Sequence, residues 1–96
     1  MARSLQPALR AGWQPQDDGT LVRTVRPVLG RRLYTATAMK PVGISPVTDL
    51  RCAMRLELRN DVGEVRQTRV FANFRQLNTY VDALETSVRL ALELSH

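Results

Sequence analysis

Apolar residues recur every three or four positions along the last quarter of the chain, which is the period of one face of an α-helix. The members of this stripe are Phe74, Leu77, Val81, Leu84, Val88 and Leu92, and Tyr80 widens it. Asn73 is a favourable N-cap residue, and Gln76 stands three positions later, as in a capping box. The pattern predicts one continuous amphipathic helix over residues 73–95, about 30 Å long.

A period of two is clearest between residues 50 and 59. Leu50, Cys52, Met54, Leu56 and Leu58 alternate with Arg51, Ala53, Arg55, Glu57 and Arg59. Strict alternation predicts a strand with one apolar and one charged face, and it places Cys52 among the buried side chains. A helix capped by Asp49 is the alternative, but it would carry no clean apolar stripe.

Three other segments have the composition of strands. Residues 20–26 are rich in β-branched side chains and end before Pro27, while residues 31–40 follow a turn at Gly30. Residues 64–71 follow the turn-forming segment 60–63 and alternate poorly, which suits a strand at the edge of a sheet.

The remaining segments predict a short helix over residues 4–11, capped by Ser4, and loops over 14–19 and 41–46. The fold class is therefore α+β. We expect a four-stranded, mainly antiparallel meander with one long C-terminal helix packed on one face. One domain over residues 1–96 divides into a helix or arm at 1–12, a sheet at 20–71 and the helix at 73–95.

The composition is that of a globular chain, with 44% hydrophobic and 24% charged residues among 96. No apolar run approaches the roughly 20 residues of a membrane span, and the N-terminal segment lacks the apolar core of a signal peptide. The single cysteine permits no intrachain disulfide. These features lead us to expect a cytoplasmic protein that does not bind membranes.

Catalytic and metal-binding patterns are weak. His96 is the sole histidine and the last residue printed, so it is a poor candidate for a general base. Asp17 and Asp18 favour a turn more than a metal site, because no further ligands follow at regular spacing. The glycines stand singly and form no phosphate-binding loop. We predict no catalytic residue, no metal and no cofactor, and hence a non-enzyme.

Positive charge is concentrated in the strand-rich part of the chain. Residues 1–59 carry ten basic and four acidic side chains, whereas residues 60–96 carry four and five. A nucleic-acid-binding face is one interpretation, and its candidate residues are Arg23, Arg26, Arg31, Arg32, Arg51, Arg55 and Arg59. The competing interpretation is a solvated face in a protein that uses arginine in thirteen of its fourteen basic positions.

Protein binding is the broader hypothesis, because the helical stripe exceeds what a small sheet covers. The predicted interface consists of Leu77, Tyr80, Val81, Leu84, Val88 and Leu92, and it would contact a protein partner or a second copy in a homodimer. The sequence thus predicts a small regulatory or adaptor-type binding protein. Nucleic-acid binding through the arginine face is the alternative.

Overall fold

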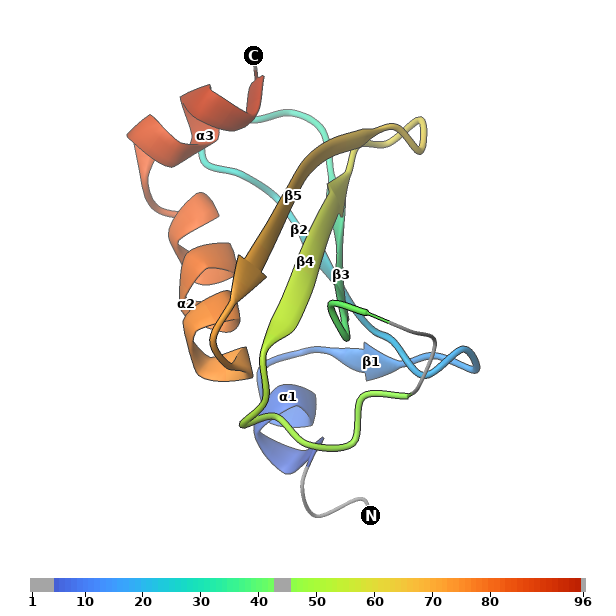
Figure 1. The fold of residues 1–96 in the computed structure, drawn as a ribbon. Helices are drawn as coiled ribbons and strands as arrows, with labels where there is room; N and C mark the ends of the chain where they lie inside the picture. The colour runs from blue at the N-terminus through green and yellow to red at the C-terminus, as the bar shows by residue number, and fades with distance from the viewer. Residues whose placement is uncertain (1–4, 43–45, 96) are drawn as a thin grey trace.

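The computed structural model describes residues 5–42 and 46–95, and in these residues it contains three helices and five strands (Figure 1). The elements in chain order are α1 (Gln6–Arg10), β1 (Gln14–Pro15), β2 (Leu21–Val25), β3 (Tyr34–Met39), β4 (Met54–Arg59), β5 (Val65–Phe71), α2 (Phe74–Leu84) and α3 (Val88–Ser95). The predicted α+β class is confirmed.

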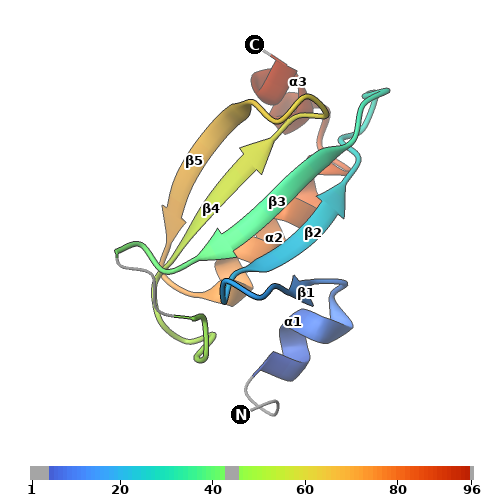
Figure 2. The same ribbon diagram turned by 90° about the vertical axis from the view of Figure 1, so that its right-hand side faces the viewer.

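The strands form one antiparallel sheet in the order β1-β2-β3-β4-β5, with α2 across one face (Figure 2). The predicted meander is therefore confirmed, but the number of strands is wrong within the described residues. Gln14 and Pro15, which we expected in a loop, pair with β2 in register Gln14↔Val22. Because this pairing is two residues long, its alternation is too short to be recognised in the sequence.

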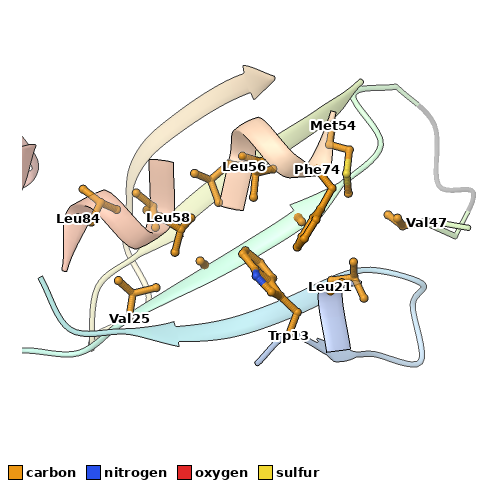
Figure 3. Packing of buried hydrophobic residues seen from close by; sticks show 14 of the residues in the cluster. Trp13, Leu21, Val25, Val47, Met54, Leu56, Leu58, Phe74 and Leu84 are labelled. Atoms are coloured by element: carbon orange, nitrogen blue, oxygen red, sulfur yellow. The ribbon is translucent and has the colours of Figure 1, made fainter. Parts of the chain in front are cut away.

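Alternation along β4 decides which face of the sheet meets the helices. Met54, Leu56 and Leu58 are buried under α2, and Leu56 and Leu58 lie opposite Ala38 and Ala36 of β3. The two alanines add little bulk beside the leucines, so the helix can pack close to the sheet. Figure 3 shows this apolar layer between the sheet and α2.

Trp13 belongs to the same layer, where it lies near Phe74 and Leu21 (Figure 3). Its ring is fully buried and packs edge-on against Phe74, with 5.5 Å between the ring centroids. Its Nε1 donates a 2.8 Å hydrogen bond to Oδ1 of Asn78, which satisfies the one polar atom of the side chain. The segment after α1 is thereby joined to α2.

The strand predicted over residues 50–59 begins only at Met54. Oδ1 of Asp49 accepts the backbone N–H of Arg51 at 2.9 Å, which closes a turn that an extended strand could not make. Cys52 consequently lies outside β4 and is exposed, so its predicted burial was wrong.

The predicted continuous helix over residues 73–95 is also wrong, because it is divided into α2 and α3. Its start is confirmed, since Oδ1 of Asn73 accepts the N–H of Gln76 at 2.9 Å. Its interruption lies at residues 85–87, where Oγ of Ser87 accepts the N–H of Leu90 at 3.3 Å and caps α3. The carbonyl of Leu84 accepts a hydrogen bond from the backbone of Val28 instead of from the next helical turn.

A cluster of charged and polar side chains around Arg23 fixes the end of α2 against the sheet. Arg23 projects from β2 toward the helices, and its side chain is only 13% exposed. Its guanidinium contacts Asp82 at 2.8 Å, Glu85 at 3.0 Å and Oδ1 of Asn78 at 2.9 Å. The second oxygen of Glu85 accepts the backbone N–H of Arg26 at 3.2 Å. We call these four side chains, Arg23, Asn78, Asp82 and Glu85, the Arg23 cluster.

The short N-terminal helix predicted over residues 4–11 is α1, and Gly12 follows it with a φ of 93°. Its predicted cap, Ser4, lies outside the described residues, as do residues 43–45 of the predicted loop 41–46. None of the helices in the described part of the chain has the length and apolar content needed to cross a membrane.

The substitution Arg23→Ala should lower the free energy of unfolding by about 1–3 kcal/mol, because it removes the charge-assisted bonds of a guanidinium whose side chain is only 13% exposed. Urea unfolding followed by the fluorescence of Trp13 measures this loss. Arg26→Ala is the matched control, since that side chain is exposed, and should change stability by less than about 0.5 kcal/mol. Equal effects of the two substitutions would contradict a structural role for the Arg23 cluster.

Candidate functional site

The connection of β2 to β3, residues 26–33, runs beside α3 (Figure 1). A groove lies between these two segments. Its volume is about 270 Å³, and its walls are mainly apolar. Leu29 and Tyr34 line one side, and Ala91 and Leu92 line the other. Leu29 is 76% exposed and Leu92 is 52% exposed, so two large apolar side chains face solvent at the same site. We call this site the α3 groove.

The backbone of Leu29 is held in an unfavourable conformation. Its φ is +66°, in the left-handed region that a leucine side chain disfavours by about 1–2 kcal/mol. The N–H of Gly30 donates to the carbonyl of Pro27 at 2.9 Å, so Leu29 occupies the third position of a turn that usually carries glycine or asparagine. A strained, exposed leucine gains nothing for the isolated fold, and such residues concentrate at functional sites.

Two of the predicted arginines lie at the rim of the α3 groove. Arg31 and Arg32 both line it, and both side chains are exposed. Arg32 lies 3.7 Å from a carboxylate oxygen of Asp61, with both groups well hydrated. Among the described residues, the side chain of Arg31 has no hydrogen-bond or ion-pair partner. The rim therefore offers two guanidinium groups to an acidic ligand.

The other predicted arginines do not form one face with these two. Arg23 points toward α2 and is committed to the Arg23 cluster. Arg51 lies in the turn before β4 and pairs with Asp49 at 3.1 Å. Arg26 follows the end of β2 and is exposed. The structure thus distributes the predicted nucleic-acid-binding residues over several surfaces.

Arg55 and Arg59 do share the face of the sheet that is left uncovered by the helices of the described part of the chain. They flank Glu57, which lies 3.7 Å from Arg55 and 3.1 Å from Arg59. Arg59 also donates to the carbonyl of Gly63 at 2.8 Å, and Nη2 of Arg55 lies 2.9 Å from the sulfur of Met39. The buried Nε of Arg55 has no hydrogen-bond partner. Arg55, Glu57 and Arg59 together therefore carry a net charge of only +1, and their charged groups mainly bind one another.

The residues of the predicted protein interface are also not on one surface. Leu77, Val81 and Leu84 are fully buried against the chain's own sheet, so they cannot form an exposed docking stripe in this fold. Their burial follows from the interruption after Leu84, because α2 alone spans the sheet and needs its whole apolar face there. Val88 and Leu92, which belong to α3, remain exposed.

Tyr80 is half-buried and faces β5. Its hydroxyl donates a 2.6 Å hydrogen bond to Oε1 of Gln67, and its ring centroid lies 5.5 Å from that of Phe71. The guanidinium of Arg69 lies over the same ring at 4.8 Å. These contacts give Tyr80 a structural position between α2 and the edge of the sheet.

The candidates for chemistry behave as turn residues where the structure describes them. Oδ1 of Asp18 accepts both the N–H and the hydroxyl of Thr20, and these bonds lower the pKa of Asp18. No group of three or more acidic, cysteine or histidine side chains in residues 5–42 and 46–95 is placed to hold a metal. His96 lies outside the described residues.

A second hollow of about 490 Å³ adjoins the start of α2, and it includes Arg51 and Arg75. Its volume falls within the roughly 300–1,000 Å³ of small-molecule sites. Most of its polar groups already have partners: Asn73 caps α2, Asn78 accepts from Trp13, and Arg51 binds Asp49. Few free polar groups converge on this hollow, whereas the α3 groove retains Arg31, whose side chain has no partner among the described residues.

Sequence reasoning missed Leu29, one of the apolar side chains of the α3 groove. It was not selected, because the segment between Pro27 and Arg31 was interpreted only as a turn. One signal was present: Val28 and Leu29 place two bulky apolar side chains in a short connection flanked by Pro27 and Gly30. Surface turns are usually polar.

Comparison with known proteins provides no family for this chain. No protein-family model matches it, and neither a curated protein nor a solved structure matches it. A function must therefore be argued from the geometry and chemistry of its surface.

The Asp49–Arg51 pair yields a testable pH dependence. The side-chain hydrogen bond from Arg51, followed by the backbone bond and the nearby charge, lowers the pKa of Asp49 below its ordinary 3.8. A carboxyl group whose pKa is lowered by folding stabilises the folded protein at pH values above the pKa of that group in the unfolded chain. This stabilisation is lost as the pH falls through the pKa of the group in the folded protein. NMR titration of the carboxyl carbons should place the midpoint of Asp49 below the ordinary value.

Arg51→Ala should raise the pKa of Asp49 toward the ordinary value and leave the pKa of Asp18 lowered, because Thr20 and not an arginine binds Asp18. An unchanged midpoint for Asp49 in this variant would show that the pair does not form in solution.

Proposed function

We propose that this chain is a small non-catalytic binding protein of the regulatory or adaptor type, and that a segment of a partner protein docks in the α3 groove. The main support is the strained and exposed side chain of Leu29 beside Leu92. Both residues increase the exposed apolar surface, and the backbone of Leu29 also costs the fold stability. A bound partner would cover these side chains and offset that cost.

The size of the groove favours a side chain of a protein over a small molecule. Its volume of about 270 Å³ is below the range of roughly 300–1,000 Å³ for small-molecule sites. It has room for one or two apolar side chains, which resembles the pocket that receives an interface anchor. The two walls come from separate segments, α3 and residues 26–33, so an inserted side chain would contact both.

The positive charge at the rim of the α3 groove indicates that the partner segment is acidic. Arg31 and Arg32 can each bind a carboxylate in a bidentate manner, and the whole chain carries a net charge of +5. An acidic segment would therefore be attracted from a distance and oriented at the rim. We infer a partner segment that inserts a bulky apolar residue between Leu29 and Leu92 and places acidic residues beside the two arginines.

Nucleic-acid binding, the alternative from the sequence, has less support from the geometry. The candidate arginines are spread over several surfaces, and Arg55 and Arg59 share the carboxylate of Glu57. Single-strand binders also present aromatic rings for base stacking. Trp13 and Phe74 are buried in the core and cannot serve that purpose.

The docking proposal is tested with a capped peptide in which a pair of leucines is flanked on either side by two glutamates. Titration into ¹⁵N-labelled protein should shift amide resonances of residues 28–34 and 88–94. Arg31→Glu combined with Arg32→Glu should weaken binding by roughly tenfold or more, since two rim charges are reversed. The matched control, Arg10→Glu with Arg75→Glu, changes the net charge equally on exposed arginines outside this groove.

Leu29→Asn separates docking from folding. Asparagine tolerates the left-handed backbone, so this variant should be about 1 kcal/mol more stable and yet bind the peptide more weakly. Equal binding of a lysine-substituted peptide, or equal loss in the control variant, would contradict the proposal. A salt-sensitive response of Arg55 and Arg59 to an oligonucleotide, without a response to the peptide, would support the alternative.

A further inference from the structure

The two edges of the sheet are protected to very different degrees (Figure 2). At one edge, β1 is two residues long and ends in Pro15, which has no N–H to donate. At the other edge, β5 runs for seven residues, and each of its side chains is exposed or half-buried. In the described part of the chain, no further strand pairs with the outer side of β5. Between Gln67 and Phe71, the outer side of β5 is therefore a sheet edge that another strand can join.

The pairing of β5 with β4 is regular over most of its length. Consecutive residue pairs run from Met54↔Phe71 to Leu58↔Gln67, and the irregularity is confined to the beginning of β5, beside Arg59. A bulge protects an edge by twisting it away from incoming strands. Here the bulge leaves the segment from Gln67 to Phe71 undistorted.

The residues of β5 are complementary to themselves about Thr68. If two copies pair antiparallel around a two-fold axis at Thr68, Val70 of each copy lies next to the regular pairing, level with the bulge at Arg66 of the other copy. Each Gln67 then lies opposite Arg69, and the two threonines face each other. No arginine opposes an arginine in this register, and Thr–Thr pairs are favourable across antiparallel strands. A register centred on Arg69 would instead place two arginines directly opposite.

Arginines on an edge strand commonly prevent such pairing, and β5 carries two of them. Arg69, however, is drawn back over the ring of Tyr80, 4.8 Å from its centroid, on the helix side of the sheet. On the uncovered side, Val70 is 62% exposed and lies beside Arg55 of β4.

We propose that the chain forms a homodimer in which β5 pairs with β5 of a second copy around Thr68, joining the two sheets into one. This surface is separate from the α3 groove, so the dimer proposal and the docking proposal are tested independently of each other. A two-fold axis perpendicular to the sheet keeps both α2 helices on one side and both uncovered faces on the other.

A charge exchange at Thr68 tests the dimer and its register together. Sedimentation or light scattering of the wild-type chain at high concentration should give about twice the 10.8 kDa chain mass. Thr68→Glu and Thr68→Arg should each be monomeric, because like charges would then face each other at the axis. An equimolar mixture of the two variants should recover the dimer, which also shows that both are folded.

A disulfide test measures the same geometry without relying on charge. In a Cys52→Ser background, which removes the exposed natural thiol, Thr68→Cys should form a linked dimer under mild oxidation. Val70→Cys should not, because the two copies of that residue would lie four positions apart, about 13 Å. A monomeric wild type, a dimer unaffected by both charged variants, or equal cross-linking at both positions would overturn the proposal.

Discussion

A positive charge on the apolar side of the sheet constrains the rest of this structure. Arg23 lies on β2 among side chains that pack against the helices, and removing its guanidinium from water is costly unless its donors are bound. All three of its side-chain partners, Asn78, Asp82 and Glu85, belong to α2 or to the residue that ends it. The rotation and the end point of α2 are therefore determined by a polar contact as well as by burial of its apolar stripe.

The end of α2 determines where α3 lies. Glu85 is held by Arg23 and by the backbone of Arg26, and the carbonyl of Leu84 is bound by Val28. The chain turns after these contacts, and Ser87 caps the next helix. Because the connection from β2 to β3 supplies two of the backbone donors, it is placed beside α3. The α3 groove is thus a consequence of the same contacts that interrupt the helix.

Local patterns were sufficient for the elements that depend on local chemistry. The alternation of Met54, Leu56 and Leu58 identified β4, and the cap at Asn73 identified the start of α2. The helix break was missed because the spacing of four from Leu84 to Val88 continues the apolar period across it. Ser87 is a favourable N-cap residue and was the one local sign of a new helix. The decisive contacts come from β2, more than fifty residues earlier, and no local pattern contains them.

The site could be predicted only in part for the same reason. Arg31, Arg32 and Leu92 were among the candidates, but two different hypotheses claimed them. Their proximity depends on the position of α3, so only the fold shows that they belong to one groove. Leu29 was absent from both lists because its strain is a property of the backbone angle and not of residue type.

The most direct test of this account is the scalar coupling across the hydrogen bond that the carbonyl of Leu84 accepts. In an uninterrupted helix this carbonyl would accept from the N–H of Val88, four residues later. The account predicts a correlation between the nitrogen of Val28 and the carbonyl carbon of Leu84, whose donor and acceptor atoms lie 3.0 Å apart. A correlation between Val88 and Leu84 in its place would contradict the divided helix, and with it the α3 groove.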